Sequence, residues 1–404
     1  MNEVNCPQNS ELSKLSPMNE APTIKEMVSE LVATPSMSST LPEYDLSNQG
    51  VINKLAGWLD NLGFAVTINE IPGRPGKSNL LATLGEGRDG LLLSGHTDTV
   101  PLDEDRWHSD PFSIKEESDR WYGLGTCDMK SFFSLVINAV IPIARAQKHG
   151  RKPLTHPLTI LASADEESSM SGVRALNAAD IGQSRYAIIG EPTSLRPINR
   201  HKGIMLLRAD ITGQSGHSSS PDKGANALDA SVQVIQELIR FRDYLKQTYQ
   251  DARFEVNYPT LNLGCIHGGN NPNRICDQVT ISLDIRTLPG MQNRNIYQEL
   301  ATKITNLRQD TGVSCSLALL HDPIAPFSNE ESQLLDTLET LADSSAGSVA
   351  FATEAPFLSG LGLETIIMGP GSIDQAHQPD EYIDLNQIEP TVAIIRALVE
   401  KYCL

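Results

Sequence analysis

Five side chains of the kinds that bind divalent metal ions occupy similar places in the sequence. Each sits in a short segment in which apolar residues give way to polar ones. They are His96, Asp128, Glu167, Glu191 and His377. Imidazole and carboxylate groups are common ligands of divalent transition metals. The pattern predicts a site for two divalent metal ions, provided that the fold brings these distant segments together.

The first segment, LLLSGHTDTVP, places His96 directly after an apolar strand, with Asp98 two residues further on. In metal sites, a carboxylate often holds the second ring nitrogen of a histidine ligand. Taken alone, this H-x-D pattern is also consistent with a histidine at a strand end and an unrelated aspartate in the turn.

Two acidic segments strengthen the prediction. In GLGTCDMKSFFSLVINAV, Asp128 precedes an apolar helix, where an aspartate is also a favourable N-cap. In LTILASADEESS, an apolar strand ends in Asp165, Glu166 and Glu167. If these three carboxylates cluster, their like charges raise one another's pKa unless a cation lies nearby. An acidic turn in solvent is the alternative.

The last two segments repeat the arrangement. In YAIIGEPTS an apolar strand leads to Glu191, and in TIIMGPGSIDQAHQPDEY a loop rich in glycine and proline carries His377. A glutamate in a surface loop would explain the first segment, whereas neither a helix nor core packing explains the imidazole in the second. Five separate coincidences are less expected than one shared site.

The elements that must position these residues have the pattern of an open α/β sheet flanked by helices. Runs with strand character span residues 79–84, 91–94, 158–163, 187–190 and 365–368. Helices are expected at residues 46–62 and, at the end of the chain, 385–402. Functional groups gather at the carboxyl ends of the strands in such sheets, and the last four runs each end next to a candidate ligand.

The pattern changes between residues 203 and 322. A strand in IMLLRADITG is followed by a long helix at 225–247, strands near Leu261 and Ile281, a helix from Asn295 and a strand at 313–319. This succession predicts an inserted β-α-β-β-α-β unit. The chain has 404 residues, more than one ordinary hydrophobic core takes. We expect a flexible tail at 1–22, a domain made of residues 23–202 and 323–404, and a second domain at 203–322.

Composition argues against several classes of function. The net charge of -18 disfavours nucleic acids and anionic membranes as partners, because both would be repelled. No segment has the length of a membrane-spanning helix and the N-terminus has no apolar signal core, so we expect a cytoplasmic protein. The six cysteines lack a C-x-x-C pair or a framework spacing, and we expect them to be reduced and mostly buried.

Six short motifs resemble those of the acetylornithine deacetylase and succinyl-diaminopimelate desuccinylase family. They are SGHTDTVP, GLGTCDMK, ADEESS, GEPTS, GHSSSP and DQAHQPDEY, and they occur in the family's order. The likeness runs from about residue 24 to the C-terminus. It implies a zinc-peptidase-like α/β catalytic domain with a mixed central sheet flanked by helices. An inserted ferredoxin-like α+β lid domain would interrupt it and form a homodimer.

The resemblance also implies how the candidate ligands divide between two metal ions. His96 and Glu191 would hold one ion, Glu167 and His377 would hold the other, and Asp128 would bridge them. Because two imidazoles accompany the carboxylates, Zn²⁺ or Co²⁺ suits the set better than Mg²⁺ or Ca²⁺, which prefer oxygen ligands. Zn²⁺ is the expected metal and Co²⁺ the alternative.

Three further residues receive catalytic roles from the resemblance. Glu166 would be the general base that takes a proton from water, and Asp98 would lie behind His96. His217, in TGQSGHSSSP, would reach the active site of a neighbouring subunit and donate a hydrogen bond to the tetrahedral oxyanion. A histidine in a flexible loop is the alternative for His217.

The implied reaction is the hydrolysis of N2-acetyl-L-ornithine to L-ornithine and acetate, a step in arginine biosynthesis. Glu354, in a TEAPF stretch that resembles the deacetylase branch, is a candidate for the substrate ammonium; a helix N-terminal glutamate is the alternative. Asn273 and Arg274 are candidates for the α-carboxylate, unless Arg274 is merely solvated at a strand edge. A desuccinylase, an aminoacylase or dipeptidase, and an inactive metal-stabilised binding scaffold remain as other functions.

Overall fold

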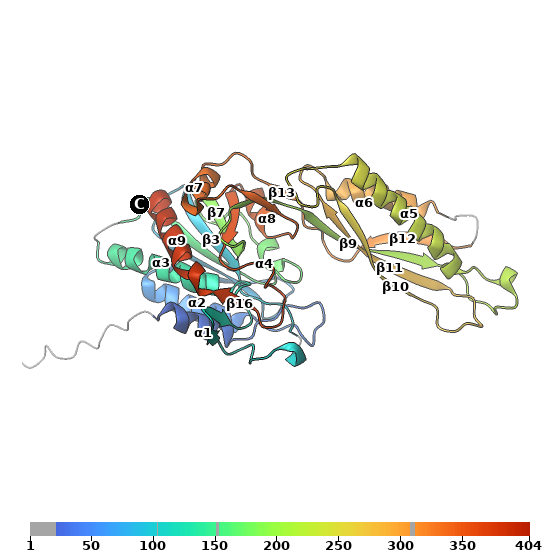
Figure 1. Cartoon of the computed structure of the whole chain (residues 1–404), viewed down its shortest axis with the longest axis horizontal. Helices are drawn as coiled ribbons and strands as arrows, with labels where there is room; N and C mark the ends of the chain where they lie inside the picture. The colour runs from blue at the N-terminus through green and yellow to red at the C-terminus, as the bar shows by residue number, and fades with distance from the viewer. Residues whose placement is uncertain (1–21, 103, 151–152, 308–311) are drawn as a thin grey trace, which may run out of the picture.

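The computed structural model of the chain describes residues 22–102, 104–150, 153–307 and 312–404. Figure 1 shows a larger body and a smaller one that projects from it. The predicted tail at 1–22 lies outside the described residues, apart from residue 22. In the part of the chain that is described, no helix has the length and apolar character needed to cross a membrane.

The larger body is built on a nine-stranded sheet with the order β1-β2-β6-β3-β7-β15-β8-β13, in which β14 pairs with β8. β3 runs parallel to β6 and β7, and β7 runs parallel to β15, whereas β2 is antiparallel to both of its neighbours. The strands are β1 (Ala65–Glu70), β2 (Ser78–Leu84), β3 (Gly90–His96), β6 (Leu158–Ser163), β7 (Ser184–Pro192), β8 (Ile198–His201), β13 (Phe327–Ser328), β14 (Gly347–Val349) and β15 (Glu364–Gly369). This mixed sheet confirms the predicted α/β class.

Helices pack on both faces of this sheet, because its inner strands are apolar on both sides. Along β3, Leu91 and Leu93 belong to one hydrophobic core and Leu92 belongs to another. The first core is packed by α1 (Ile24–Val32), α2 (Gln49–Leu62), α3 (Lys130–Lys148), α7 (Gln333–Ala342) and α9 (Ile388–Cys403). The second is packed by the short helices α4 (Ser171–Arg174) and α8 (Ala355–Gly360).

A second sheet of three strands joins two parts of the chain that carry candidate ligands. It consists of β4 (Lys115–Glu117), β5 (Arg120–Tyr122) and β16 (Tyr382–Asp384). Tyr122 pairs with Tyr382 in an antiparallel register. The segment before Asp128 is thereby held next to the segment after His377, although the two are far apart in the sequence.

The smaller body is a ferredoxin-like unit. Its elements follow the predicted order, with β9 (Gly203–Thr212), α5 (Ala227–Thr248), β10 (Thr260–Gly268), β11 (Gln278–Thr287), α6 (Asn293–Thr305) and β12 (Ser314–Leu319). The strands form an antiparallel sheet with the order β10-β11-β9-β12. α5 and α6 pack on one face of this sheet and share a separate hydrophobic core with it (Figure 1).

Two predicted helices are shorter than their apolar patterns suggested. The helix expected at 46–62 begins at Gln49, because the backbone N–H of Leu46 donates to the carbonyl of Met37 and holds the entry segment outside the helix. The helix expected at 385–402 begins at Ile388 and follows the 3₁₀ turn η3 (Leu385–Gln387). The other 3₁₀ turns in the described residues are η1 (Glu104–Arg106) and η2 (Pro221–Lys223).

No disulfide joins the cysteines of the described residues. Cys127, Cys276, Cys315 and Cys403 are buried, and Cys265 is exposed on β10. Cys6 lies outside the described residues. Cys276, Cys315 and Cys403 belong to the hydrophobic cores, whereas the thiol of Cys127 donates a hydrogen bond to the carbonyl of Ser372.

Candidate metal centre

The five candidate ligands converge at the carboxyl edge of the central sheet. His96 is the last residue of β3, and Glu191 is the last but one of β7. Glu167 lies in the turn that follows β6, and both β6 and β7 flank β3 in parallel. Asp128 precedes α3, and His377 lies in the loop that follows β15. Strands that end at one edge thus assemble residues from distant parts of the chain.

Asp128 lies between the two imidazoles. Its Oδ1 is 3.0 Å from Nε2 of His96, and its Oδ2 is 3.6 Å from Nε2 of His377. Oε2 of Glu167 is 2.9 Å from the same His377 nitrogen. The ligand atoms of His96, Asp128 and Glu191 lie within 4.8 Å of one another, as do those of Asp128, Glu167 and His377. One carboxylate is therefore common to two possible metal-binding groups.

The chemistry of this donor set fits divalent cations. Glu191 is 5% exposed, and its Oε1 is buried without a hydrogen-bond partner. Burial, and then the charge of Asp128, raises the pKa of Glu191 well above its usual value. Burial and the charge of Glu191 do the same to the pKa of Glu166. Cations held among these carboxylates would offset both the desolvation and the mutual repulsion.

Nearby carboxylates raise the pKa values of both imidazoles. Burial lowers the pKa of His96, but Asp128, Glu191 and Glu166 raise it by more, so the net shift is well upward. The hydrogen bond with Glu167 raises the pKa of His377 to about 9. Because a histidine ligand must be neutral at the binding nitrogen, metal binding here would release protons.

Asp98 contacts His96 differently from the expected carboxylate–imidazole pair. Nδ1 of His96 is 3.0 Å from the backbone oxygen of Asp98 but 3.8 Å from its carboxylate. The carboxylate instead accepts hydrogen bonds from the backbone N–H groups of Glu166 and Glu167. Asp98 thus orients the imidazole through its main chain and holds the acidic turn through its side chain.

Glu381 supports the loop that carries Asp128, a role that its sequence context did not reveal. Its buried carboxylate accepts hydrogen bonds from the backbone N–H groups of Gly125, Cys127 and Asp128. Burial raises the pKa of Glu381 to about 8. The sequence hinted at this role only by placing Glu381 shortly after His377, in QPDEY. Such a pattern does not reveal that an acid in a loop is buried.

Glu354 lies behind the metal centre. Its side chain is 1% exposed, and the hydroxyl of Ser94 donates a hydrogen bond of 3.4 Å to its Oε2. Its Oε1 is buried without a partner, and burial raises the pKa of Glu354 to about 7. The structure therefore places this carboxylate in the interior, and Glu354 is not among the residues that line the cavity beside the metal centre.

The three remaining predicted residues lie together at the far end of the ferredoxin-like unit. His217 and Arg274 form an isolated β-bridge, and the carbonyl of Asn273 accepts the backbone N–H of Ser218. At roughly 3.3 Å per residue, β9 covers about 26 Å between its near end at Ile204 and its far end at Thr212. None of the three is brought to the metal centre of its own chain.

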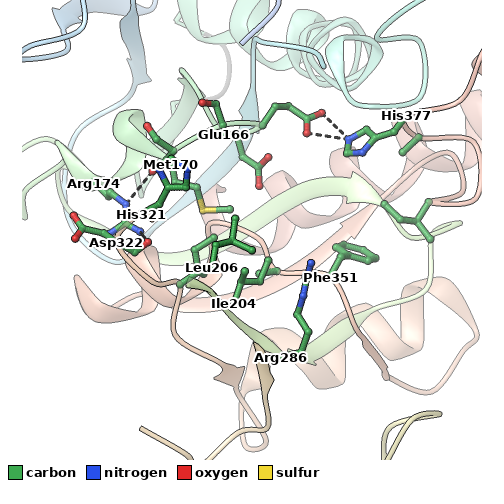
Figure 2. A pocket seen from close by; sticks show the side chains of 17 residues that line it. Glu166, Met170, Arg174, Ile204, Leu206, Arg286, His321, Asp322, Phe351 and His377 are labelled. Carbon is green, nitrogen blue, oxygen red and sulfur yellow. Dashed lines mark hydrogen bonds and ion pairs between the residues drawn. The ribbon is translucent and has the colours of Figure 1, made fainter. Parts of the chain in front are cut away.

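A cavity of about 450 Å³ lies between the metal centre and the ferredoxin-like unit (Figure 2). Its lining includes Glu166, Glu167, Met170, Arg174, Ile204, Leu206, Arg286, His321, Asp322, Phe351 and His377. Figure 2 shows Arg286 rising from the side opposite to Glu166 and His377. The sequence did not single out Arg286 or Asp322, because strand alternation assigns a residue to a sheet face without saying what that face covers.

Comparisons with known proteins cover almost the whole chain. The model of peptidase family M20/M25/M40 matches residues 92–401. A protein of Proteus mirabilis named acetylornithine deacetylase is 46% identical over 95% of this chain and 97% of its own length. A protein of Pasteurella multocida with the same name is 44% identical over 96% of this chain and 100% of its own.

Solved structures share the fold at low sequence identity. A tripeptidase of Staphylococcus aureus superposes with a TM-score of 0.72 at 16% identity, covering 93% of this chain and 98% of its own. A dinuclear metal binding peptidase of Bacillus subtilis superposes with a TM-score of 0.65 at 13% identity, covering 93% of this chain and 97% of its own. At such identities the likeness concerns the fold alone.

Proposed function

The chain belongs to peptidase family M20/M25/M40 and is a metal-dependent amidohydrolase, and we propose that it removes the acetyl group from N2-acetyl-L-ornithine. The products are L-ornithine and acetate. The main support is the name carried by relatives that are 42–46% identical over about 95% of the chain. We further propose a cytoplasmic role in arginine biosynthesis.

His96, Asp128 and Glu191 hold one divalent ion in this proposal, and Asp128, Glu167 and His377 hold the other. The support is the sharing of Asp128 by two groups whose ligand atoms lie within 4.8 Å of one another. Zn²⁺ is the proposed metal, and Co²⁺ is the alternative. When bound, the pair supplies Lewis-acid chemistry that lowers the pKa of water and polarises an amide carbonyl.

Glu166 is the proposed general base. It lines the cavity, and its carboxylate lies near His96 and Glu167 but outside the two groups that share Asp128. It is therefore free to accept a proton from the attacking water and to return that proton to the leaving nitrogen. The side chain of Asp98 fixes the backbone from which Glu166 projects.

Arg286 is the proposed partner of the substrate α-carboxylate. Its guanidinium lines the cavity, whereas Arg274 of the same chain lies at the far end of β11. Asp284 accepts hydrogen bonds from both Nε and Nη2 of Arg286 and so holds the guanidinium plane in place. A planar guanidinium suits a carboxylate because it can donate two parallel hydrogen bonds.

We also propose a homodimer in which His217, Asn273 and Arg274 complete the site of the partner subunit. The support is their shared location, away from the metal centre of their own chain. Apolar side chains are exposed on the same unit, with Leu228 43% and Val232 54% exposed on α5, and Ile266 51% exposed on β10. A second copy that covers these side chains would also pair the free edge of β10.

A substrate panel tests the proposed function. Purified enzyme loaded with Zn²⁺ or Co²⁺ is given N2-acetyl-L-ornithine, N-succinyl-L,L-diaminopimelate and a dipeptide, and kcat/KM is measured for each. We expect acetylornithine to be hydrolysed fastest. Faster hydrolysis of the succinyl compound or the dipeptide would assign the same metal centre to a different substrate.

A further inference from the structure

The wall of the cavity on the side of the ferredoxin-like unit comes from the open face of its sheet. Along β9, Met205 and Leu207 point into the core beneath α5 and α6, so the alternate residues Ile204 and Leu206 face away from that core. Both of these residues line the cavity. The open face thus offers an aliphatic surface next to the metal centre.

Charged side chains lie at the two ends of this aliphatic surface. Arg286 of β11 is paired in register with Ile204, and Ile204 forms a β-bridge with Ile324 of the returning segment. Asp322 lies two residues before Ile324, and the backbone N–H of the nearby Leu320 donates to the carbonyl of Leu206. In Figure 2, Ile204 and Leu206 lie between Arg286 and Asp322.

The separation of these two charges suits a short diamino acid. Two strand spacings of roughly 4.8 Å place the backbones of Arg286 and Ile324 about 10 Å apart across the sheet, and Asp322 lies two residues further along the returning segment. In ornithine, three methylene groups separate the α-carbon from the ammonium. The α-carboxylate of ornithine would face Arg286, its methylene groups would lie along the aliphatic surface, and its ammonium would face Asp322.

The carboxylate of Asp322 is available to a ligand. Asp322 is exposed, and within the described ranges its side chain makes no hydrogen bond or ion pair. The nearby cation, Arg174, donates instead to the backbone carbonyls of Asp322, Pro323 and Ser169, and its guanidinium lies 4.8 Å from the centre of the Phe357 ring. Arg174 therefore fixes the segment that carries Asp322, and its guanidinium feels the charge of the Asp322 carboxylate without forming a hydrogen bond or ion pair with it.

We propose that Asp322 receives the distal ammonium of the substrate and makes the enzyme selective for N-acyl-α-amino acids with a cationic side chain. The inference rests on the proposed deacylase function. It adds the residue that selects the side chain of the substrate. It assigns to Asp322 the role that the sequence suggested for Glu354, which is 1% exposed and does not line this cavity.

The test compares two substrates that differ only at the end of the side chain. N-acetyl-L-norleucine carries a methyl group where N2-acetyl-L-ornithine carries the ammonium. For metal-loaded Asp322→Asn we expect kcat/KM for acetylornithine to fall roughly 10- to 100-fold, mainly through KM, as for the loss of a hydrogen bond between charged groups. Hydrolysis of acetylnorleucine should stay close to wild type.

Three further variants separate specificity from general damage. Asp374→Asn removes the same charge from an exposed residue beside the cavity and should leave both substrates unchanged. Asp322→Glu should restore part of the preference for acetylornithine. Glu354→Gln should change the hydrolysis of both substrates by the same factor. A loss of preference in Glu354→Gln but not in Asp322→Asn would overturn the inference.

Failure of the inference is distinguishable from failure of the proposed function. If wild type hydrolyses acetylornithine and acetylnorleucine equally well, the deacetylase function stands and the role of Asp322 is wrong. If wild type hydrolyses neither compound, the proposed function is wrong, and calorimetric binding of L-ornithine and L-norleucine then decides the role of Asp322. Tighter binding of ornithine that disappears in Asp322→Asn supports the role, and equal binding of both amino acids rejects it.

Discussion

At the scale of single residues, the metal centre brings several carboxylates close together, where they repel one another. Asp128, Glu166, Glu167 and Glu191 lie within one buried region, where the pKa values of the three glutamates are raised first of all by burial. Backbone N–H groups that donate to Asp98 and Glu381 fix the acidic turn and the Asp128 loop. The chain thus holds its carboxylates in a repulsive arrangement that only cations would make favourable.

Replacement of the proposed base tests its role most simply. We expect Glu166→Gln to lower kcat roughly 100- to 10,000-fold, because general acid–base catalysis contributes about that much. Metal content, measured by elemental analysis, should stay near that of wild type, since Glu166 lies outside the two groups that share Asp128. Substantial activity in the metal-loaded variant would show that another group takes the proton.

The sequence predicted which acids and imidazoles converge, but it did not predict how each supporting residue would act. Asp98 bonds His96 through its main chain, which no side-chain pattern encodes. Glu354 has the residue type expected for an ammonium partner, yet it is buried, because burial depends on elements packed from elsewhere in the chain. Arg286 became a candidate only when the sheet register brought it next to Ile204 and the cavity.

At the scale of elements, the site depends on the close approach of α3 to the ends of β3 and β7. Two glycines make this approach possible. A Cβ added at Gly190 would lie 2.4 Å from the ring of Phe132, and one added at Gly95 would lie 2.7 Å from Cε of Met129. Glu191 follows Gly190 directly, and Asp128 shortly precedes α3. The spacing of helix and strand therefore sets the distance between two candidate ligands.

A methyl group at this contact should disturb the metal centre. We expect Gly190→Ala to lower the free energy of unfolding by about 1–3 kcal/mol, as overpacking does, and to weaken metal binding. Calorimetric unfolding and metal titration of the purified variant measure the two effects. Adding Phe132→Leu, which removes the obstructing ring, should recover part of both.

Gly57→Ala is the matched control, because a Cβ there meets no atom within 4 Å and Gly57 lies inside the helix α2. It should leave metal binding unchanged and stabilise the protein slightly, since alanine favours helix more than glycine does. Unchanged metal affinity in Gly190→Ala would contradict a role for this contact in setting the ligand geometry.

Element boundaries were predictable wherever local periodicity alone decides them. The strand expected at residues 158–163 is β6 to the residue, and the β-α-β-β-α-β order was read from alternating patterns. The start of α2 was predicted too early, because Leu46 fits the helical period but its backbone pairs with Met37. The sheet β4-β5-β16 joins residues more than 250 positions apart and left no recognisable local pattern.

At the scale of the whole molecule, the ferredoxin-like unit meets the larger body through a few specific contacts. Nζ of Lys202, the last residue of the larger body before the unit, donates hydrogen bonds of 2.7 Å to the carbonyls of Val256 and Tyr258. The hydroxyl of Ser348 on the larger body donates to the carbonyl of Arg253 in the same α5–β10 loop. These contacts hold the near end of the unit over the metal centre and direct its far end away from it.

The remote position of His217 leads to a prediction about mixed dimers. His217→Ala and Glu166→Gln should each be nearly inactive, because one lacks the proposed oxyanion donor and the other lacks the proposed base. Mixed after subunit exchange, they should recover roughly a quarter of wild-type activity, because half of the dimers in a symmetric exchange carry one intact site. No recovery, despite exchange demonstrated by differently tagged subunits, would mean that His217 does not act in a partner's site.

The central claim is that two metal ions held by His96, Asp128, Glu167, Glu191 and His377 carry out amide hydrolysis. The most direct test measures bound metal and N2-acetyl-L-ornithine hydrolysis on the same samples during exhaustive chelation and then during stepwise return of Zn²⁺ or Co²⁺. We predict that activity disappears with the metal and returns fully as the content approaches two ions per chain. Full activity in the metal-free protein would contradict the claim.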